Sequence, residues 1–377
     1  MTKPIEIHTL GDHLDRIARL FVDLPFRIYR DNDRWVPWFR GDVKRILRRE
    51  HPLFDHSFGE FFAATEGHET VGRLAMFENT RYNSEHNIKS AHFFFFDALE
   101  DPRVSESLFG AAIDWAKGRG LDVLLGPMGF GGATGGGVLI DGFDHRAAMT
   151  MMAYNHPYYA GLLEGVGFEK YLDLHSAFID ASEFRLPERV GRVAQRVLAR
   201  GNFKVLRFKS KAALRRIALD IGRVYNQSED RHAETYSYSE GELRQVIRDL
   251  LFVADPSLIK VLTYKDQIVG YLFGFPDLSA ALQRSGGRLN PLVMLDLMRE
   301  FKRTDGLIIN GAGILPRFQR LGGNALLYYE LEKTVRESDY RYADLVQIAE
   351  TTTLMLSDIE TLGGKIYKTH RIYRLNL

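Results

Sequence analysis

Apolar and polar positions follow the same order twice along the 377-residue chain. Residues 61–79 and 259–277 each contain an apolar strand-like run, a polar turn and a second strand-like run, with a Val-Gly-x-Leu motif after the turn. An apolar strand pattern follows each hairpin, at 91–99 and at 306–315. The repetition predicts two copies of one hairpin-plus-strand unit.

The remainder of each copy reads as helix, strand, helix and final strand. In the first copy these patterns lie at 104–120, 121–127, 158–168 and 169–180. In the second copy they lie at 324–338, 342–350, 351–364 and 365–377. The late helix is followed by Gly167 in one copy and by Gly363 in the other. Helices commonly end at a glycine that adopts the left-handed conformation. We expect a mixed α/β fold duplicated in tandem, with domains at 1–183 and 184–377 whose final strands close each unit.

Each copy also carries segments that the other lacks. The first contains a glycine-dense loop at 126–137, which looks like a wall of a cleft between the domains or a surface loop. The second contains two helical patterns, near 210–227 and 239–252, and an insertion at 278–303.

Composition narrows the class of protein. Fifty Lys and Arg against 49 Asp and Glu give a formal net charge of +1, which argues against a nucleic-acid-binding protein. The absence of cysteine excludes a disulfide scaffold, a thiol nucleophile and a thiolate metal site. The first residues lack a signal-peptide pattern, and no apolar run approaches the roughly 18–20 residues that span a bilayer. We expect a cytoplasmic protein.

The stretch 313–332 carries the clearest candidate chemistry. An apolar strand ends at Pro316, and a loop containing arginines and two glycines leads into a helix that opens at Asn324. Unpaired backbone N–H groups at a helix start, with nearby arginines, favour a phosphate-bearing ligand. The stretch completes neither a dinucleotide-binding motif nor a P-loop. The alternative is an ordinary glycine-rich turn with surface arginines.

The order of elements and this loop resemble the GNAT-type N-acyltransferases, whose diphosphate loop is usually written Q/R-x-x-G-x-G/A. The spacing from Arg320 fits that pattern, whereas the spacing from Gln319 departs from it at the last position, so the register stays open. The resemblance implies a mixed-sheet fold and acyl-CoA as co-substrate, lying between two strands that part. It implies that CoA contacts Ile314, Leu315, Arg317, Gln319, Arg320, Gly322, Gly323, Asn324 and Ala325.

The first copy departs from the family pattern where its own diphosphate loop would lie. Residues 100–107 contain Glu100 and Asp101 and no glycine. Because like charges repel at close range, we expect this copy to have lost CoA binding. It would then either shape the acceptor pocket or serve as structural support.

Three residues of the second copy are candidates for proton transfer. Glu350 follows a strand whose end, by resemblance, lies near the thioester, so it could act as a general base or be an ordinary helix-start carboxylate. Tyr367 and His370 lie where the resemblance places residues near the thiol. Either could protonate the departing sulfur, and either could be a half-buried strand residue.

Candidate acceptor-binding residues come from both copies. The second-copy loop 226–242 is polar and aromatic, which suits an acceptor lid, although Ser239-x-x-Glu242 also reads as a helix capping box. The first-copy segment 155–170 looks like the late helix of the family. The candidates are Glu229, His232, Tyr236, Asn155, Tyr158 and Tyr159. No histidine spacing is typical of a metal site, and we expect no metal.

Residues 34–49 combine six basic side chains with Trp35, Trp38 and Phe39, a mixture that suits an anionic membrane surface or a solvated helix with an apolar underside. With the duplicated fold and the stretches 154–168 and 313–332, this patch points to a resemblance to the bacterial ceramide synthases. The resemblance implies acyl transfer from acyl-CoA to a primary amine, most concretely a sphingoid base, with possible contact at the inner membrane face. The alternatives are acetylation of a small polar amine, Fem-type aminoacyl transfer, and a non-catalytic acyl-CoA sensor.

Overall fold

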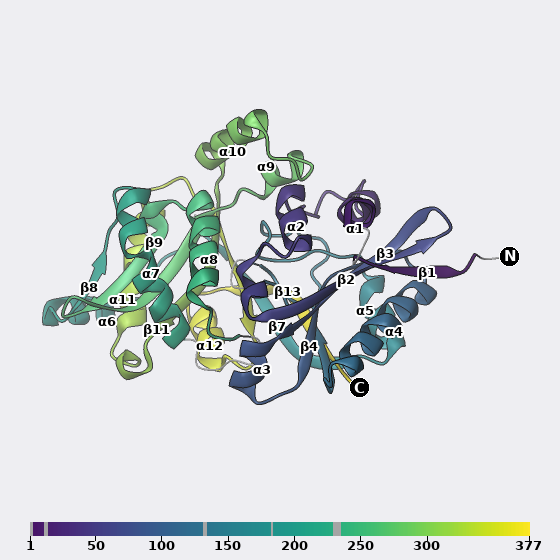
Figure 1. The fold of residues 1–377 in the computed structure, drawn as a ribbon. Coiled ribbons are helices and arrows are strands. Elements are labelled where there is room, and N and C mark those ends of the chain that lie inside the picture. The colour runs from purple at the N-terminus through teal and green to yellow at the C-terminus, as the bar shows by residue number, and fades with distance from the viewer. Residues whose placement is uncertain (1–2, 11–13, 131–133, 182–183, 229–234) are drawn as a thin grey trace.

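The computed structural model describes residues 3–10, 14–130, 134–181, 184–228 and 235–377. Within these residues thirteen strands form one mixed sheet, which Figure 1 shows running across the whole molecule from β8 at one end to β1 at the other. The strand order is β1-β2-β3-β4-β5-β13-β7-β12-β11-β10-β9-β8, and β6 pairs with β13. The mixed α/β class expected from the sequence is confirmed.

The first half of the chain supplies one end of this sheet. Its elements are β1 (Ile5–Thr9), α1 (Leu14–Ile28), α2 (Arg40–Leu47), η2 (Pro52–Asp55), β2 (Ser57–Glu66), β3 (Glu69–Asn79), α3 (Thr80–His86), β4 (Ser90–Ala98), α4 (Pro102–Gly118), β5 (Val123–Gly126), β6 (Val138–Asp141), α5 (Tyr158–Val166) and β7 (Glu169–Asp180). The alternation of β2 and β3 places apolar side chains such as Phe62, Leu74 and Met76 against α4, where they are buried with Leu108 and Phe109.

The second half repeats the order. Its elements are α6 (Glu188–Arg200), β8 (Phe203–Leu206), α7 (Lys211–Ser228), α8 (Glu240–Val253), η3 (Pro256–Leu258), β9 (Ile259–Tyr264), β10 (Gln267–Pro276), α9 (Ser279–Arg284), α10 (Pro291–Arg303), β11 (Gly306–Ile314), η4 (Pro316–Phe318), α11 (Gly323–Arg336), β12 (Tyr342–Ala349), α12 (Thr353–Thr361) and β13 (Lys365–Asn376). Helix α7 packs on β10 and β11, whereas α6 and α11 pack together against β8 and β9.

The two halves exchange their final strands. Strand β13, which ends the second half, pairs antiparallel with β5 and β6 of the first half. Strand β7, which ends the first half, pairs with β12 of the second, and β7 and β13 pair with each other at the centre. The expectations that residues 169–180 close the first copy and that residues 365–377 close the second are therefore both wrong. Each half needs a strand from the other to complete its part of the sheet.

Candidate active site

Strands β11 and β12 separate at the place where the second half would admit a ligand. Their parallel pairing runs only from Gly306 opposite Tyr342 to Ile309 opposite Leu345. Beyond it, β11 stays paired with β10 as far as Ile314, while β12 stays paired with β7. The two strands therefore diverge while each remains held by its outer neighbour, and one edge of each is left without a strand partner.

Irregular backbone on both strands marks the point of divergence. On β11, Asn310 and Gly311 lie in a bulge opposite a single residue of β10, and Gly311 has a φ of 100°, in the left-handed region that glycine tolerates. On β12, Gln347 has a φ of 51°. The Gln347 side chain donates to the carbonyl oxygen of Gly136 at 2.7 Å and accepts from its N–H at 2.8 Å. This pair of hydrogen bonds attaches the glycine-dense loop of the first half to the opening.

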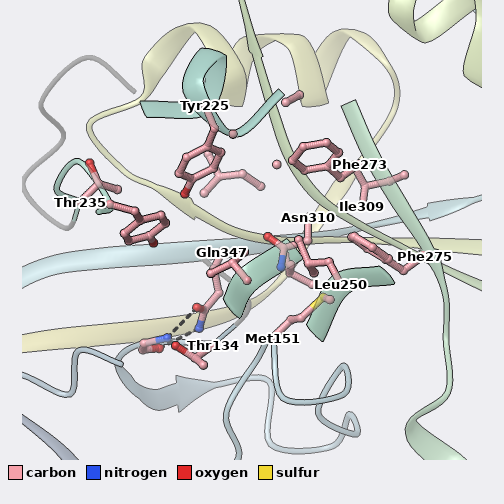
Figure 2. A pocket seen from close by; sticks show the side chains of 18 of the residues that line it. Thr134, Met151, Tyr225, Thr235, Leu250, Phe273, Phe275, Ile309, Asn310 and Gln347 are labelled. Carbon is pink, nitrogen blue, oxygen red and sulfur yellow. Dashed lines mark hydrogen bonds between the residues drawn. The ribbon is translucent and has the colours of Figure 1, made fainter. Parts of the chain in front are cut away.

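The opening leads into a cavity of about 340 Å³ between the sheet and the helices α7 and α8. Figure 2 shows side chains of both halves around it, with Gln347 and Thr134 on one side and Phe273, Phe275 and Leu250 on another. Most of its lining is apolar. The helical contribution includes Leu214, Ala218, Ile221, Leu243, Val246, Ile247, Leu250 and Leu251. A cavity with this lining suits a hydrocarbon chain.

The predicted anion-binding loop lies immediately after β11. Residues 316–318 form the short helix η4, and α11 begins at Gly323 after Gly322, whose φ is 88°. Gly322 has no side chain to cap the helix. The Leu326 N–H donates to the Gly322 carbonyl, which is the first hydrogen bond of the helix. The N–H groups of Gly323, Asn324 and Ala325 thus belong to the first turn, where helix geometry leaves them without an internal partner. Asn324 is exposed and Ala325 half-buried, whereas Gly323 is buried, so the N–H groups of Asn324 and Ala325 are the better placed to meet an anion.

The side chains of the loop divide into exposed and buried groups. Arg317, Gln319, Arg320 and Asn324 are exposed, so the loop is not covered by other parts of the described chain. Gln319 donates from Nε2 to the Ile314 carbonyl at 3.0 Å, and Asn324 donates to Asp358 at 3.3 Å. Because these two side chains already have partners, Arg317 and Arg320 are the better candidates to pair with phosphate oxygens.

Two of the predicted CoA contacts face the core. Ile314 and Leu315 are each 5% exposed and pack in the apolar core of the second half. Their backbone can border the opening, but their side chains point to the sheet–helix interface. Ala325 is half-buried at the helix start.

The equivalent place in the first half already contains a carboxylate. Asp101 caps α4, accepting from the Arg103 N–H at 3.0 Å, and its pKa is lowered by hydrogen bonds from the Arg103 side chain. Pro102 occupies the first helical position and removes one N–H donor. Strand β4 also bulges at Phe95 and parts from β5, but the Met128 N–H bonds to the Phe93 carbonyl at 2.9 Å and draws the following segment back. This half does not offer the arrangement seen after β11.

Glu350, the predicted general base, lies in a charged cluster at the end of β12. Its carboxylate accepts from Lys170 Nζ at 2.8 Å and from the Asp173 N–H at 3.0 Å. These hydrogen bonds, the Lys170 one foremost, lower the pKa of Glu350. It is absent from the described cavity lining, which includes its neighbours Ala349 and Thr352.

Tyr367 and His370 also lie away from the cavity lining. The Tyr367 hydroxyl donates to Asp344 at 2.7 Å, near the start of β12. His370 is fully buried, its Nε2 contacts the Ala153 carbonyl at 2.9 Å, and burial lowers its pKa to about 4. Its neighbour along the strand, Ile372, does line the cavity. The structure therefore does not bring Glu350, Tyr367 and His370 together.

The first-half acceptor candidates lie within their own core. Asn155 uses its side chain to bond both the N–H and the carbonyl of Leu139, at 2.7 and 3.1 Å. Tyr159 is buried and bonds to Asp97 and Tyr29, at 3.1 and 2.9 Å. Tyr158 donates to the Ala98 carbonyl at 2.9 Å. None of the three is among the described residues that line the cavity.

The second-half acceptor loop does reach the cavity, through Tyr236. Glu229 and His232 lie outside the described residues, and Tyr236 lines the cavity. The Tyr236 hydroxyl donates to Glu242 Oε1 at 2.5 Å, and Glu242 Oε2 lies 3.0 Å from His56 Nε2 of the first half. Glu242 also completes the capping box with Ser239 that the sequence predicts.

This cluster holds Glu242 as a carboxylate and Tyr236 as a phenol. Burial favours a higher pKa for Glu242, but hydrogen bonds from Tyr236, the Ser239 N–H and His56 outweigh it and lower that pKa. Burial, reinforced by the Glu242 charge, raises the pKa of Tyr236 well above its usual value. The Tyr236 hydrogen is thus committed to Glu242, and the Tyr236 oxygen accepts a hydrogen bond from the Asn79 side chain, which opposes the rise in pKa.

Sequence reasoning missed most of the cavity lining. The apolar side chains of α7 and α8 read as ordinary core, and the only signal of a cavity was that both helices are additions to the hairpin plan. The sequence did not indicate that Gln347 or His56 belongs to this site. Gln347 has an unusual backbone conformation that its sequence does not reveal, and His56 contacts Glu242, which lies 186 residues further along the chain.

Two further structural tests concern metals and membranes. Among the residues that the structure describes, no group of three or more His, Asp or Glu side chains is arranged to hold a metal ion. In the same residues no helix is long and apolar enough to cross a bilayer.

Comparison with known proteins supports the fold and names two similar sequences. No family model matches the chain. It is 24% identical over 361 residues to Protein YghO of Escherichia coli, covering 94% of this chain and 92% of that protein. It is 27% identical over 373 residues to a bacterial ceramide synthase of Caulobacter vibrioides, covering 94% and 93%.

Solved structures match the whole chain at low sequence identity. A tandem GNAT protein from the clavulanic acid biosynthesis pathway has a TM-score of 0.56 at 12% identity, covering 99% of this chain and 98% of that one. The glucosamine N-acetyltransferase region of a fungal multi-domain β-N-acetylglucosaminidase has a TM-score of 0.55 at 12% identity, covering 100% of this chain and 38% of that one. The chain adopts the tandem GNAT-type fold, and its sequence is similar over nearly its full length to a bacterial ceramide synthase.

Proposed function

We propose that the chain is an acyl-CoA-dependent N-acyltransferase that transfers a long acyl chain to a primary amine. The observation that carries this proposal is the divergence of β11 and β12 beside the amide-rich loop before α11, with an apolar cavity behind it. These features lie in the order that an acyl-CoA requires, from phosphates through an amide-containing arm to an acyl chain.

The residues of the opening fit the successive parts of acyl-CoA. The first-turn N–H groups of α11, with Arg317 and Arg320, would bind the diphosphate. The free edge of β11 beyond Ile309 offers backbone groups to the two amides of the pantetheine arm, as a strand edge does to an added strand. The apolar side chains of α7 and α8 would then enclose the acyl chain.

Direct transfer requires the uncharged amine nitrogen to attack the thioester carbonyl carbon. A C–N bond forms and the C–S bond breaks, the nitrogen loses a proton, and the thiolate gains one to leave as free CoA. The bulge at Asn310 and Gly311 turns backbone away from the β10 ladder, where an N–H group can stabilise the developing oxyanion. Glu242 holds the Tyr236 hydrogen and Asn79 donates to one lone pair of the Tyr236 oxygen, so the other lone pair would accept a hydrogen bond from the amine and orient it.

A lipid-like amine is the acceptor that fits best. The cavity draws its apolar lining from both halves, including Met128, Met151 and Leu174 of the first. Burying each methylene is worth about 0.8 kcal/mol, so a long chain gains affinity that a small polar amine does not. The similarity to a protein named bacterial ceramide synthase supports a sphingoid base within this class.

A non-catalytic acyl-CoA sensor is the second candidate. The described residues that line the cavity include no carboxylate, imidazole or amine. A protein that only binds acyl-CoA needs no such group, whereas a transferase must obtain its proton acceptor from water, from the substrate, or from a residue beyond this lining.

Measuring CoA release tests these possibilities together. Purified protein is incubated with palmitoyl-CoA or acetyl-CoA and with sphinganine, spermidine or no amine, and both the thiol and the amide product are quantified. We expect thiol and amide in equal amounts with palmitoyl-CoA and sphinganine. Turnover only with acetyl-CoA and spermidine would contradict the lipid assignment, and tight palmitoyl-CoA binding without thiol release under any amine would favour the sensor.

A further inference from the structure

Helix α10 is apolar on two opposite faces. On its inner face Leu297 is buried, and Val293, Met294 and Phe301 pack against the core of the second half. The outer face has no such cover in the described chain. Leu292 is 78% exposed, Met298 56% and Leu295 40%, and Leu289 just before the helix is 56% exposed. Large apolar side chains gathered on one exposed face mark an interaction site.

The charges around this outer face are distributed unevenly. The two acidic residues of α10, Asp296 and Glu300, are both bound by Arg284 of α9, with Arg284 Nε to Asp296 at 2.9 Å. The basic residues are exposed and form no ion pair within the described chain. They are Arg288, Arg299, Lys302 and Arg303. The apolar stripe is therefore bordered by unpaired positive charge, while its negative charge is already neutralised.

The insertion that carries α10 is fixed to the basic segment 34–49. The Arg40 N–H bonds to the Gly287 carbonyl at 2.7 Å, and Gln283 donates to the carbonyls of Asp33 and Trp35, at 2.7 and 2.9 Å. Figure 1 shows α9 and α10 projecting beyond the sheet beside α2. Lys44 of α2 and Arg48, which follows the last residue of that helix, are exposed as well and add positive charge to this part of the protein.

The aromatic residues of segment 34–49 are not the exposed apolar part of this surface. Trp35 stacks on Tyr29 with ring centroids 4.9 Å apart, and Trp38 packs edge-on against Phe95 at 5.3 Å. Both tryptophans are half-buried. The apolar contribution comes instead from α10, which the sequence pattern alone did not single out.

We infer that the outer face of α10 docks the protein on an anionic lipid bilayer, with its apolar side chains at the acyl boundary and the surrounding cations at the headgroups. Apolar residues on one helix face, bordered by Lys and Arg, are the pattern of a helix that lies in a membrane interface. The inference goes beyond the proposed function, because membrane docking and acyl transfer can fail independently of each other.

Vesicle co-sedimentation of the full chain tests the inference. The probes are vesicles of phosphatidylcholine alone and of phosphatidylcholine with one quarter phosphatidylglycerol. The test variant is Leu292→Gln with Met298→Gln, and the matched control is Phe58→Gln, since Phe58 is 55% exposed on β2. Circular dichroism melting verifies that all three proteins are folded.

We expect the wild type and the Phe58→Gln control to bind the anionic vesicles at least tenfold more tightly than the neutral ones, and the double variant to lose at least tenfold in binding. Equal binding of the double variant and the wild type would overturn the inference. A second result would also overturn it: wild-type protein that does not bind vesicles and that light scattering shows to be a dimer, with the double variant a monomer. The outer face of α10 would then contact a second copy of the chain.

Discussion

Filling the cavity beside α7 should shorten the acyl chain that the protein accepts. Ala218 is 7% exposed, lies on α7 and lines the cavity, so Ala218→Phe places a phenyl ring in the space assigned to the acyl chain. The exposed Ala212 on the same helix provides a matched control, Ala212→Phe, in which the ring points to solvent.

The size of the effect follows from the methylenes that the ring displaces. If the ring excludes about four methylenes of the acyl chain, the lost burial is about 3 kcal/mol at about 0.8 kcal/mol each. Since each 1.4 kcal/mol is about tenfold, the specificity constant for palmitoyl-CoA should fall on the order of 100-fold. If the acyl chain enters between β11 and β12, a butyryl chain should end before the ring, so its rate should change little.

The assay is thiol release measured as kcat/KM for butyryl-, octanoyl- and palmitoyl-CoA with a fixed amine. We expect the ratio of palmitoyl to butyryl activity to collapse in Ala218→Phe and to stay unchanged in Ala212→Phe. A uniform loss over all three chain lengths would contradict the assignment of the cavity to the acyl chain, because it would indicate general damage to the protein. A changed selectivity for the length of the amine, with unchanged selectivity for the acyl chain, would also contradict this assignment. It would indicate that the cavity binds the chain of the acceptor amine.

Three further predictions concern particular residues. Tyr236→Phe should lower kcat/KM for the amine roughly tenfold or more while leaving CoA affinity unchanged, as steady-state kinetics and calorimetry would check, because the hydrogen bond to the amine is removed. The variant also loses the hydrogen bond to Glu242, so its melting temperature should fall as well. Gly322→Ala should weaken CoA binding and lower the melting temperature together, since a Cβ at φ 88° costs roughly 1–2 kcal/mol and would approach Val197 Cγ2 to 2.7 Å. Burial raises the pKa of Asp344 from 3.8 to about 6, so the folded protein binds this proton more tightly than the unfolded chain does. The free energy of unfolding should therefore fall by about 3 kcal/mol as the pH rises from about 4 through 6. Asp344→Asn should remove this part of the slope in urea unfolding at pH 4.5 and 7.5, and an unchanged slope would contradict the assignment.

The repeat and the glycine-containing loop before α11 were predictable from the sequence because both are local patterns. Alternation and helical periodicity gave the order of elements in each half, and the glycines before Asn324 marked the helix start where N–H groups remain unpaired. The acidic residues before α4 also indicated correctly that Asp101 would occupy the matching place in the first half.

The exchange of β7 and β13 could not be predicted, because a strand pattern does not identify its partner. Both strands read as suitable for either copy, and pairing was decided by contacts nearly 200 residues apart in sequence. The same limit applies to His56 and Glu242, which come from different halves. Asn155 and Tyr159 look like pocket residues in the sequence. In the structure, however, Asn155 hydrogen-bonds to the backbone of Leu139 and Tyr159 to the Asp97 side chain, inside the core of the first half.

The proposed function requires that one half of the duplicated fold binds CoA, at the loop between β11 and α11. Isothermal titration of CoA into the wild-type protein and into the Arg317→Ala, Arg320→Ala double variant tests it most directly. We expect one CoA per chain and at least a tenfold weaker affinity in the double variant, since two charge-assisted hydrogen-bonding groups are lost. Two CoA molecules per wild-type chain, or equal affinity in the double variant, would contradict it.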